Sequence, residues 1–247
     1  MSNNFEYFES IALIEGLKEI KEEQNLTIEK ISQELNVNKS TISRYLNQQI
    51  LPTSKHKEKI IIWLENKGLE ASVIVNRYVT QMLTASGKKV LSLTKLMNQP
   101  KKLFLISYLF IKKNPWVQDT DIVITVETEG IPFATIFGLL LGKTVAYFRK
   151  QRSVTWPDFI RIDLERAEVA VTEPLFLNRE IVQGKNKALI LDDIVRSGET
   201  ISKLHEGLTR EGIQTLGVII LTSLTKKIPF SKPKPIHGFN PILTVEF

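Results

Sequence analysis

The residues best suited to bind a ligand form a single run between Leu189 and Ile201. Its apolar beginning predicts a strand, and Asp192 and Asp193 follow where such a strand would reach the edge of a sheet. Carboxylates at that place can accept hydrogen bonds from ribose hydroxyl groups. The loop behind them offers backbone N–H groups, two hydroxyls and a helix N-terminus, which together can hold a phosphate. Gly198 lets the backbone come close to it. This pattern predicts a ribose-phosphate site; an acidic turn that only caps the next helix is the alternative.

A strand, helix and strand are predicted before this run. Residues 121–126 form a β-branched run typical of a buried strand, and residues 133–141 are apolar nearly all round, as in a helix under a sheet. Residues 143–148 predict the second strand. This order calls for a parallel sheet with helices on its faces, in which ligands bind at the carboxyl ends of the strands. We therefore expect the turn at 127–132, the basic residues at 149–150 and the acidic pair to share one edge.

These motifs resemble those of the type I phosphoribosyltransferases, which bind 5-phosphoribosyl-1-diphosphate. The pattern is that of the branch with xanthine phosphoribosyltransferases and the purine-operon repressor, and it covers about residues 101 to 225. The resemblance implies an α/β, parallel-sheet fold, with the acidic pair on the ribose. It places the 5′-phosphate at Ser197, Gly198 and Thr200, and we add the neighbouring Arg196 and Glu199 to the candidate site. It places the pyrophosphate at Glu127, Thr128, Glu129, Gly130, Arg149 and Lys150.

One position departs from the family pattern. Arg196 stands where the family usually has a small residue, and the repressor type also carries a basic residue there. This departure favours sensing over catalysis, so no catalytic residue is assigned. Glu127 and Glu129 would repel a bare pyrophosphate, so we expect Mg²⁺ to accompany phosphoribosyl diphosphate, without a metal site made by the protein alone and without a covalently bound cofactor. The alternative for these two glutamates is a solvated turn.

Residues 26–46 predict two short amphipathic helices joined by a tight turn. Thr27 and Asn38 are suited to be the N-caps of the two helices, and Val37 to pack at the turn. The apolar faces consist of Ile28, Ile31 and Leu35 in the first helix and Ile42, Tyr45 and Leu46 in the second. Such a pair is a helix-turn-helix, and it resembles the phage-repressor-like (XRE) class.

The second of these helices is the candidate for reading DNA in the major groove. The candidate DNA contacts are Thr27, Lys39, Ser40, Thr41, Ser43 and Arg44. Residues 36–60 carry five cations and one anion, a net charge of +4, whereas residues 1–35 carry three lysines and eight glutamates, a net charge of −5. This polarity favours a groove-facing surface. The alternative is a helix pair that only packs against another domain or a protein partner.

The length of 247 residues and the hydrophobic content of 43% suit one small and one medium domain. We expect a DNA-binding domain over 1–65, a helical connector over 66–100 and a ligand-binding domain over 101–247. The chain has no cysteine, which excludes disulfides, thiolate metal sites and a cysteine nucleophile. Its three histidines make a histidine-rich metal site improbable. The tail after Thr225 contains four prolines and is expected to be either a hood over the base site or a fixed terminus.

Membrane and export signals are weak in this sequence. The apolar run 103–111 is too short to span a bilayer and predicts a buried helix, and the first residues lack the order of a signal peptide. We expect a cytoplasmic protein without a membrane partner.

Two kinds of motif in one chain predict a ligand-responsive transcription regulator. It would bind operator DNA as a homodimer and sense phosphoribosyl diphosphate or a purine nucleotide. One alternative is an active phosphoribosyltransferase that forms a nucleoside monophosphate, and another is an enzyme whose N-terminal part binds only protein.

Overall fold

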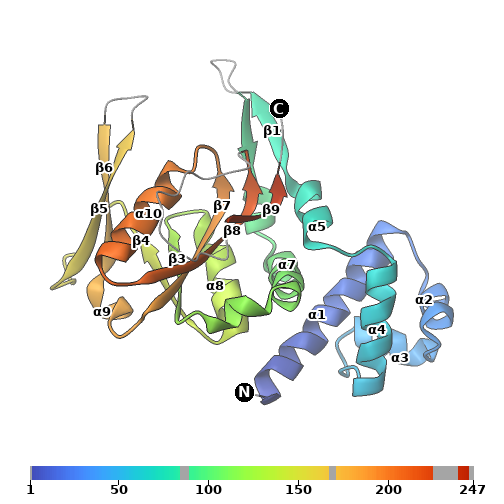
Figure 1. Cartoon of the computed structure of the whole chain (residues 1–247). Coiled ribbons are helices and arrows are strands. Elements are labelled where there is room, and N and C mark those ends of the chain that lie inside the picture. Colours follow the sequence, from blue (N-terminus) through green and yellow to red (C-terminus); the bar gives the residue numbers. More distant parts are fainter. Residues whose placement is uncertain (1, 84–88, 167–170, 225–238, 245–247) are drawn as a thin grey trace.

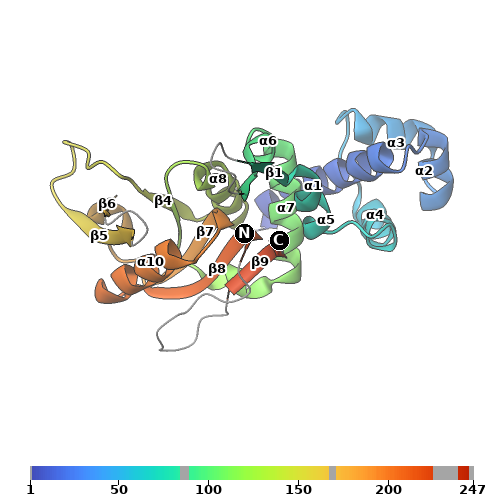
Figure 2. The same cartoon turned by 90° about the horizontal axis from the view of Figure 1, so that it is seen from above.

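The N-terminal part of the chain consists of helices, and the C-terminal part is built around a parallel sheet (Figure 1). The structure is a computed structural model that describes residues 2–83, 89–166, 171–224 and 239–244. In two perpendicular views the small helices α2 (Ile28–Leu35) and α3 (Lys39–Leu46) lie at one end of the molecule. The hairpin of β5 (Phe159–Arg166) and β6 (Val171–Asn178) lies at the other end (Figures 1 and 2). None of the helices in the described part has the length and apolar character needed to cross a bilayer.

Capping residues and apolar faces form the predicted helix pair. The side chain of Thr27 accepts a hydrogen bond from the Lys30 N–H at 3.1 Å, and that of Asn38 accepts one from the Ser40 N–H at 2.9 Å, so both predicted N-caps are confirmed. The predicted apolar residues are buried or packed against the core. The N-terminal helices are α1 (Ser2–Glu23), α2 (Ile28–Leu35), α3 (Lys39–Leu46) and α4 (Ser54–Asn66).

Helix α1 lies between the other N-terminal helices and the C-terminal part. It packs against α3 and α4 of the N-terminal part and against α7 (Pro100–Lys113) of the C-terminal part. All residues from Ser10 to Ile20 are buried or partly buried, including Glu15 and Glu19. One apolar cluster therefore runs from the helix-turn-helix through α1 and α7 to one face of the sheet.

The connector differs from the expectation. It begins with the helix α5 (Ala71–Tyr78), but an antiparallel hairpin of β1 (Thr80–Leu83) and β2 (Lys89–Ser92) follows, so the helical prediction is wrong for these two segments. Val79, Thr80 and Val90 are β-branched and compatible with extended backbone, but the pairing of β1 with β2 decides their conformation. A short helix, α6 (Thr94–Met97), then leads into α7, which is the predicted buried helix.

The predicted parallel sheet is confirmed. Its strand order is β4-β3-β7-β8-β9, and all four neighbouring pairs are parallel. Helices α7 and α8 cover one face, while α10 and the antiparallel β5–β6 hairpin cover the other. The sheet elements are β3 (Ile122–Val126), β4 (Thr144–Phe148), β7 (Lys187–Val195), β8 (Gln214–Ser223) and β9 (Phe239–Thr244). The remaining elements are η1 (Pro115–Asp119), α8 (Gly130–Leu141), β5 (Phe159–Arg166), β6 (Val171–Asn178), α9 (Arg179–Val182) and α10 (Glu199–Arg210).

Two element boundaries near the candidate site differ from the predictions, and the C-terminal segment adds a strand to the sheet. Helix α8 begins at Gly130, three residues before the predicted start at 133. Strand β7 continues through the acidic pair to Val195, because β8 pairs with it as far as Ser223. The chain end forms β9, which fixes residues 239–244 at the edge of the sheet, whereas the prolines proposed as a hood before residue 239 lie outside the described residues.

Candidate functional sites

The acidic pair lies in the last part of β7. The Oδ1 atom of Asp192 accepts a hydrogen bond from the backbone N–H of Asp193 at 3.0 Å. Burial, followed by the negative charge of Asp193, raises the pKa of Asp192 well above its ordinary value. Burial also raises the pKa of Asp193, with a further contribution from the charge of Glu129. Two adjacent carboxylates held in this way favour partners that donate hydrogen bonds or carry positive charge.

The loop between β3 and α8 approaches the acidic pair closely. A Cβ atom at Gly130 would lie 2.9 Å from Asp192 Oδ1 and 2.5 Å from Thr125 Oγ1, so only glycine fits without movement. Thr125 is buried at the end of β3, and its hydroxyl has no hydrogen-bond partner among the residues that the structure describes. The structure therefore brings the predicted pyrophosphate loop and the predicted ribose pair together at one edge.

The two predicted cations lie beside carboxylates. Arg149 Nε lies 3.8 Å from Glu127 Oε2, and the backbone N–H of Lys150 donates a hydrogen bond to the Glu127 carboxylate. Lys150 Nζ forms an ion pair with Glu173 Oε1 of β6 at 2.8 Å. The Arg149 guanidinium also lies 5.7 Å from the ring centroid of Trp156. A polyanion bound at this edge would therefore compete with these glutamates for the two cations.

The predicted phosphate loop connects β7 to α10. Gly198 has a φ of 84° and is the N-cap residue of α10, a conformation that favours glycine. Ser197 Oγ accepts a hydrogen bond from the Glu199 N–H at 3.4 Å. Arg196 is exposed, and Thr200 lies in the first turn of the helix. The loop thus presents a helix N-terminus at the edge that holds the acidic pair.

The connector contributes a contact that the sequence did not predict. Thr94, the first residue of α6, donates a hydrogen bond from its hydroxyl to Glu129 Oε1 at 3.4 Å. Ser92 Oγ lies 2.9 Å from the same hydroxyl. Two hydroxyl residues at the end of an apolar segment are common in turns. The sequence therefore offers no reason to assign these two residues to the site. The connector therefore reaches the candidate site.

A hollow of about 480 Å³ lies elsewhere. It is lined in part by Arg179, Asn186 and Ile213, which stand before or beside the amino ends of β7 and β8. Arg179 there is paired with Glu211 and, at 2.8 Å, with Asp158. In parallel α/β sheets ligands bind at the carboxyl ends of the strands, which favours the acidic pair over this hollow as the candidate ligand site.

The predicted DNA-reading helix α3 presents its polar residues outward. Lys39, Ser40 and Arg44 are exposed, and Thr41 and Ser43 are partly exposed. Lys39 Nζ pairs with Glu29 Oε2 at 3.0 Å, but both side chains are more than half exposed, so a phosphate can displace this pair at little cost. Thr27 is exposed at the start of α2 while its hydroxyl caps the helix. Together these residues form the surface that we call the reading face.

Comparison with known families identifies both parts. Residues 93–242 match the phosphoribosyl transferase domain family over more than half of the chain. The chain belongs to this family. Residues 17–60 match a helix-turn-helix family of the XRE type, and this match begins inside α1. The phosphoribosyl transferase match begins at residue 93, so residues 61–92, which include α5 and the β1–β2 hairpin, belong to neither match.

Individual members of the phosphoribosyl transferase family are similar over part of their length. A xanthine phosphoribosyltransferase of Deinococcus deserti is 32% identical over 98 residues, which are 39% of this chain and 50% of that protein. An adenine phosphoribosyltransferase of Petrotoga mobilis is 27% identical over 120 residues, 48% of this chain and 67% of that protein. This chain thus spans between half and two thirds of the length of these relatives.

Solved structures show the same fold. An adenine phosphoribosyltransferase of Rhodothermus marinus superposes with a TM-score of 0.58 at 17% identity, covering 71% of this chain and 98% of that one. The enzyme from Thermoanaerobacter pseudethanolicus gives a TM-score of 0.58 at 18% identity, with 70% and 99% coverage. At this identity the likeness establishes the phosphoribosyl transferase fold of the C-terminal part.

Within the described residues, no group of three or more carboxylate or histidine side chains could hold a metal ion by itself. The donor set at the predicted site consists of Glu127, Glu129 and the acidic pair. These carboxylates suit Mg²⁺ only when another ligand, such as a diphosphate, supplies further oxygens.

Proposed function

We propose that this protein is a ligand-responsive transcription regulator. Its reading face binds operator DNA, and its acidic strand end senses phosphoribosyl diphosphate or a purine nucleotide. The observation that supports this proposal most is that a helix-turn-helix with an exposed polar face is joined to a phosphoribosyl transferase fold by the packing of α1 on α7 and by one apolar core. A ligand that binds the two arrangements of such a molecule unequally changes its DNA affinity.

The residues at the ligand site are assigned roles in this proposal. Asp192 and Asp193 bind the ribose hydroxyls, and the loop from Arg196 to Thr200 binds the 5′-phosphate. The pyrophosphate lies against Gly130 and the neighbouring loop, with Arg149 and Lys150 supplying positive charge. Glu127 and Glu129 would repel a bare diphosphate, and a Mg²⁺ ion bound together with it would reduce this repulsion.

DNA binding requires two copies in this proposal, because helix-turn-helix proteins commonly read pseudo-palindromes as dimers. Analytical ultracentrifugation of the free protein and of its DNA complex tests this. A single protomer on an isolated half-site, with no second protomer added at higher concentration, would contradict the homodimer.

The test of the reading face uses DNA selected by the wild-type protein from a random-sequence library. We expect Arg44→Ala to weaken binding by about 1–3 kcal/mol if the side chain reads a base, and to lower the slope of affinity against salt by about one if it contacts a phosphate. Arg210→Ala removes the same charge from the exposed end of α10 and serves as the control. Equal DNA affinity of the Arg44 variant and the control would refute the assignment.

Active phosphoribosyl transfer is the second candidate function. It is favoured by the relatives, which are named as phosphoribosyltransferases of xanthine and adenine. Purified protein is incubated with phosphoribosyl diphosphate, Mg²⁺ and each nucleobase in turn. A turnover of about 1 per second or more would support the enzyme, since that is the lower range of ordinary enzyme rates. Release of pyrophosphate without a nucleobase serves as the blank.

A further inference from the structure

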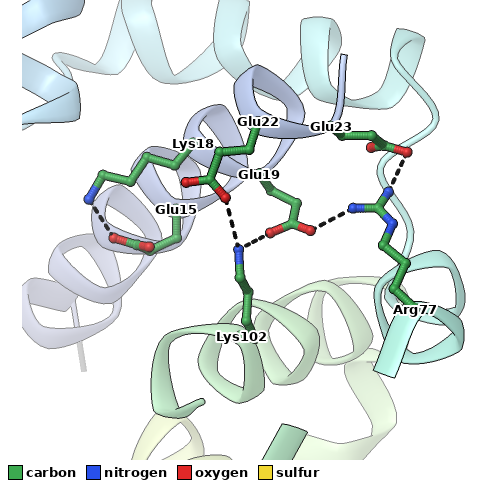
Figure 3. A network of polar contacts seen from close by, with 7 residues as sticks. All are labelled: Glu15, Lys18, Glu19, Glu22, Glu23, Arg77 and Lys102. Carbon is green, nitrogen blue, oxygen red and sulfur yellow. Dashed lines mark hydrogen bonds and ion pairs between the residues drawn. The ribbon is translucent and has the colours of Figure 1, made fainter. Parts of the chain in front are cut away.

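Helix α1 carries a buried carboxylate that faces the C-terminal part of the molecule. The Glu19 side chain is only 5% exposed, and it pairs with Lys102 in the first turn of α7 and with Arg77 Nη1 of α5 at 2.7 Å (Figure 3). Two further glutamates of α1 flank it: Glu22 lies 3.8 Å from Lys102 Nζ, and Glu23 pairs with Arg77. We call these five residues the α1 cluster.

Lys102 of the α1 cluster keeps its positive charge although its side chain is partly buried. Burial opposes the charged form of Lys102, but the Glu19 carboxylate outweighs it, so the pKa of this lysine is raised. Removing one partner of a buried ion pair leaves the other charge without compensation, which is strongly destabilising. The cluster therefore restricts how α1 can be placed on α7 and α5.

One turn earlier, α1 contacts the helix-turn-helix. Glu15 is buried and accepts a hydrogen bond from Gln48 Nε2 at 2.9 Å, while Lys18 Nζ pairs with the same oxygen at 2.8 Å. Gln48 lies just beyond the end of α3, and its backbone N–H donates to the Tyr45 carbonyl at 2.8 Å. Neighbouring turns of α1 thus hold the end of the reading helix and the start of α7.

The start of α7 is also tied to the ligand site. Helix α6 directly precedes α7 and packs against it, and Thr94 at the start of α6 donates its hydrogen bond to Glu129 in the predicted pyrophosphate loop. A ligand that draws Glu129 toward a bound Mg²⁺ or away from a phosphate would change this contact. The contacts then run in sequence from Glu129 through α6 and α7 to Lys102, Glu19, Glu15 and Gln48.

We propose that the α1 cluster is the mechanical link through which occupancy of the ligand site changes the DNA affinity of the reading face. The proposal rests on the proposed function, since it needs both a ligand and a DNA target. Contiguity alone does not establish coupling, so the decisive quantity is a ratio of affinities. This ratio is the dissociation constant of the DNA complex without phosphoribosyl diphosphate and Mg²⁺ divided by the constant with them.

The test compares Lys102→Met with Lys67→Met. Both lysines are partly buried in ion pairs, with side chains 18% and 22% exposed, but Lys67 pairs with Glu34 of α2 at 2.9 Å and so acts only within the N-terminal helices. We expect the wild-type ratio, or its inverse, to lie within the usual range of about 5- to 150-fold. Lys102→Met should bring the ratio to within about twofold of one, and Lys67→Met should keep it within about twofold of wild type.

Lys102→Arg and Glu19→Gln complete the set. The arginine retains the charge and should keep the wild-type ratio, whereas Glu19→Gln keeps the size, removes the charge and serves if Lys102→Met does not fold. Calorimetry with phosphoribosyl diphosphate and Mg²⁺ checks that each variant still binds the ligand. A wild-type ratio of one would overturn the proposed function itself. A wild-type ratio, or its inverse, above about fivefold that survives in both Lys102→Met and Glu19→Gln would overturn only the role of the α1 cluster.

Discussion

The acidic pair should reduce the stability of the folded protein while serving ligand binding. Burial and the charge of Asp193 raise the pKa of Asp192 in the folded state, so folding favours the protonated form of this carboxyl. The contribution of Asp192 to the free energy of unfolding is then fully present below its unfolded pKa of about 3.9. It is lost as the pH rises through the pKa of the folded state. Asp192 therefore lowers the stability at neutral pH, and this cost increases with pH until the pH exceeds the folded value.

Asp192→Asn tests this reasoning. The amide has the size of the carboxyl and retains an oxygen for the hydrogen bond from the Asp193 N–H, but it carries no charge. We expect it to stabilise the ligand-free protein near pH 7 by about 1–3 kcal/mol, the range for unfavourably buried polar groups. For a chain of this size that corresponds to about 2–12 °C in Tm. The gain should disappear toward pH 4.

Ligand binding should change in the opposite direction. An amide is a weaker acceptor than a carboxylate for ribose hydroxyls, so the same variant should bind phosphoribosyl diphosphate less tightly in calorimetry. Asp119→Asn, at an exposed position in η1, is the control and should change neither quantity. A lower Tm of Asp192→Asn at pH 7 would refute the reasoning, because it would show that the ionised carboxyl stabilises the fold.

Three further substitutions test separate parts of the structure. Gly130→Ala places a Cβ 2.9 Å from Asp192 Oδ1 and should lower stability by about 1–3 kcal/mol and weaken ligand binding, as measured by thermal unfolding and calorimetry. Asn38→Ala removes the cap of α3 and should cost about 1 kcal/mol in thermal unfolding and weaken DNA binding; unchanged stability would contradict the cap. Arg179→Ala breaks the half-exposed pair with Glu211 and should cost at most about 1 kcal/mol without affecting ligand affinity; a loss of affinity would move the site to the hollow.

Local sequence signals were sufficient for the elements that position the reading face and the acidic pair. Thr27 and Asn38 act as caps because a short polar side chain can satisfy free N–H groups at a helix start, which depends only on neighbouring residues. The alternation of apolar strands with an apolar helix predicted the parallel sheet, because few chain topologies are compatible with this pattern.

The parts that the sequence did not predict depend on contacts between distant segments. Strands β1 and β2 are short, and their pairing decides their conformation. The sequence of each segment alone therefore fits a helix as well as a strand. The continuation of β7 past Asp192 depends on the length of β8, which pairs with it. The hydrogen bond from Thr94 to Glu129 joins residues that are far apart in the chain. Neither residue type by itself indicates this contact.

The glutamates in the first 35 residues have a structural role as well as an effect on the charge distribution. The acidic excess of residues 1–35 suggested a polarity that leaves the reading face basic. Three of these glutamates instead hold α1 in place: Glu9 pairs with Lys57 of α4 at 3.2 Å and accepts a hydrogen bond from Tyr108 of α7, Glu15 contacts Gln48, and Glu19 pairs with Lys102. Each of the three carboxylates lies beside a lysine, Lys57, Lys18 and Lys102 respectively, so this negative charge is balanced within the protein. Glu9 and Glu19 therefore join the N-terminal helices to α7 of the C-terminal part, and Glu15 joins α1 to the end of the reading helix.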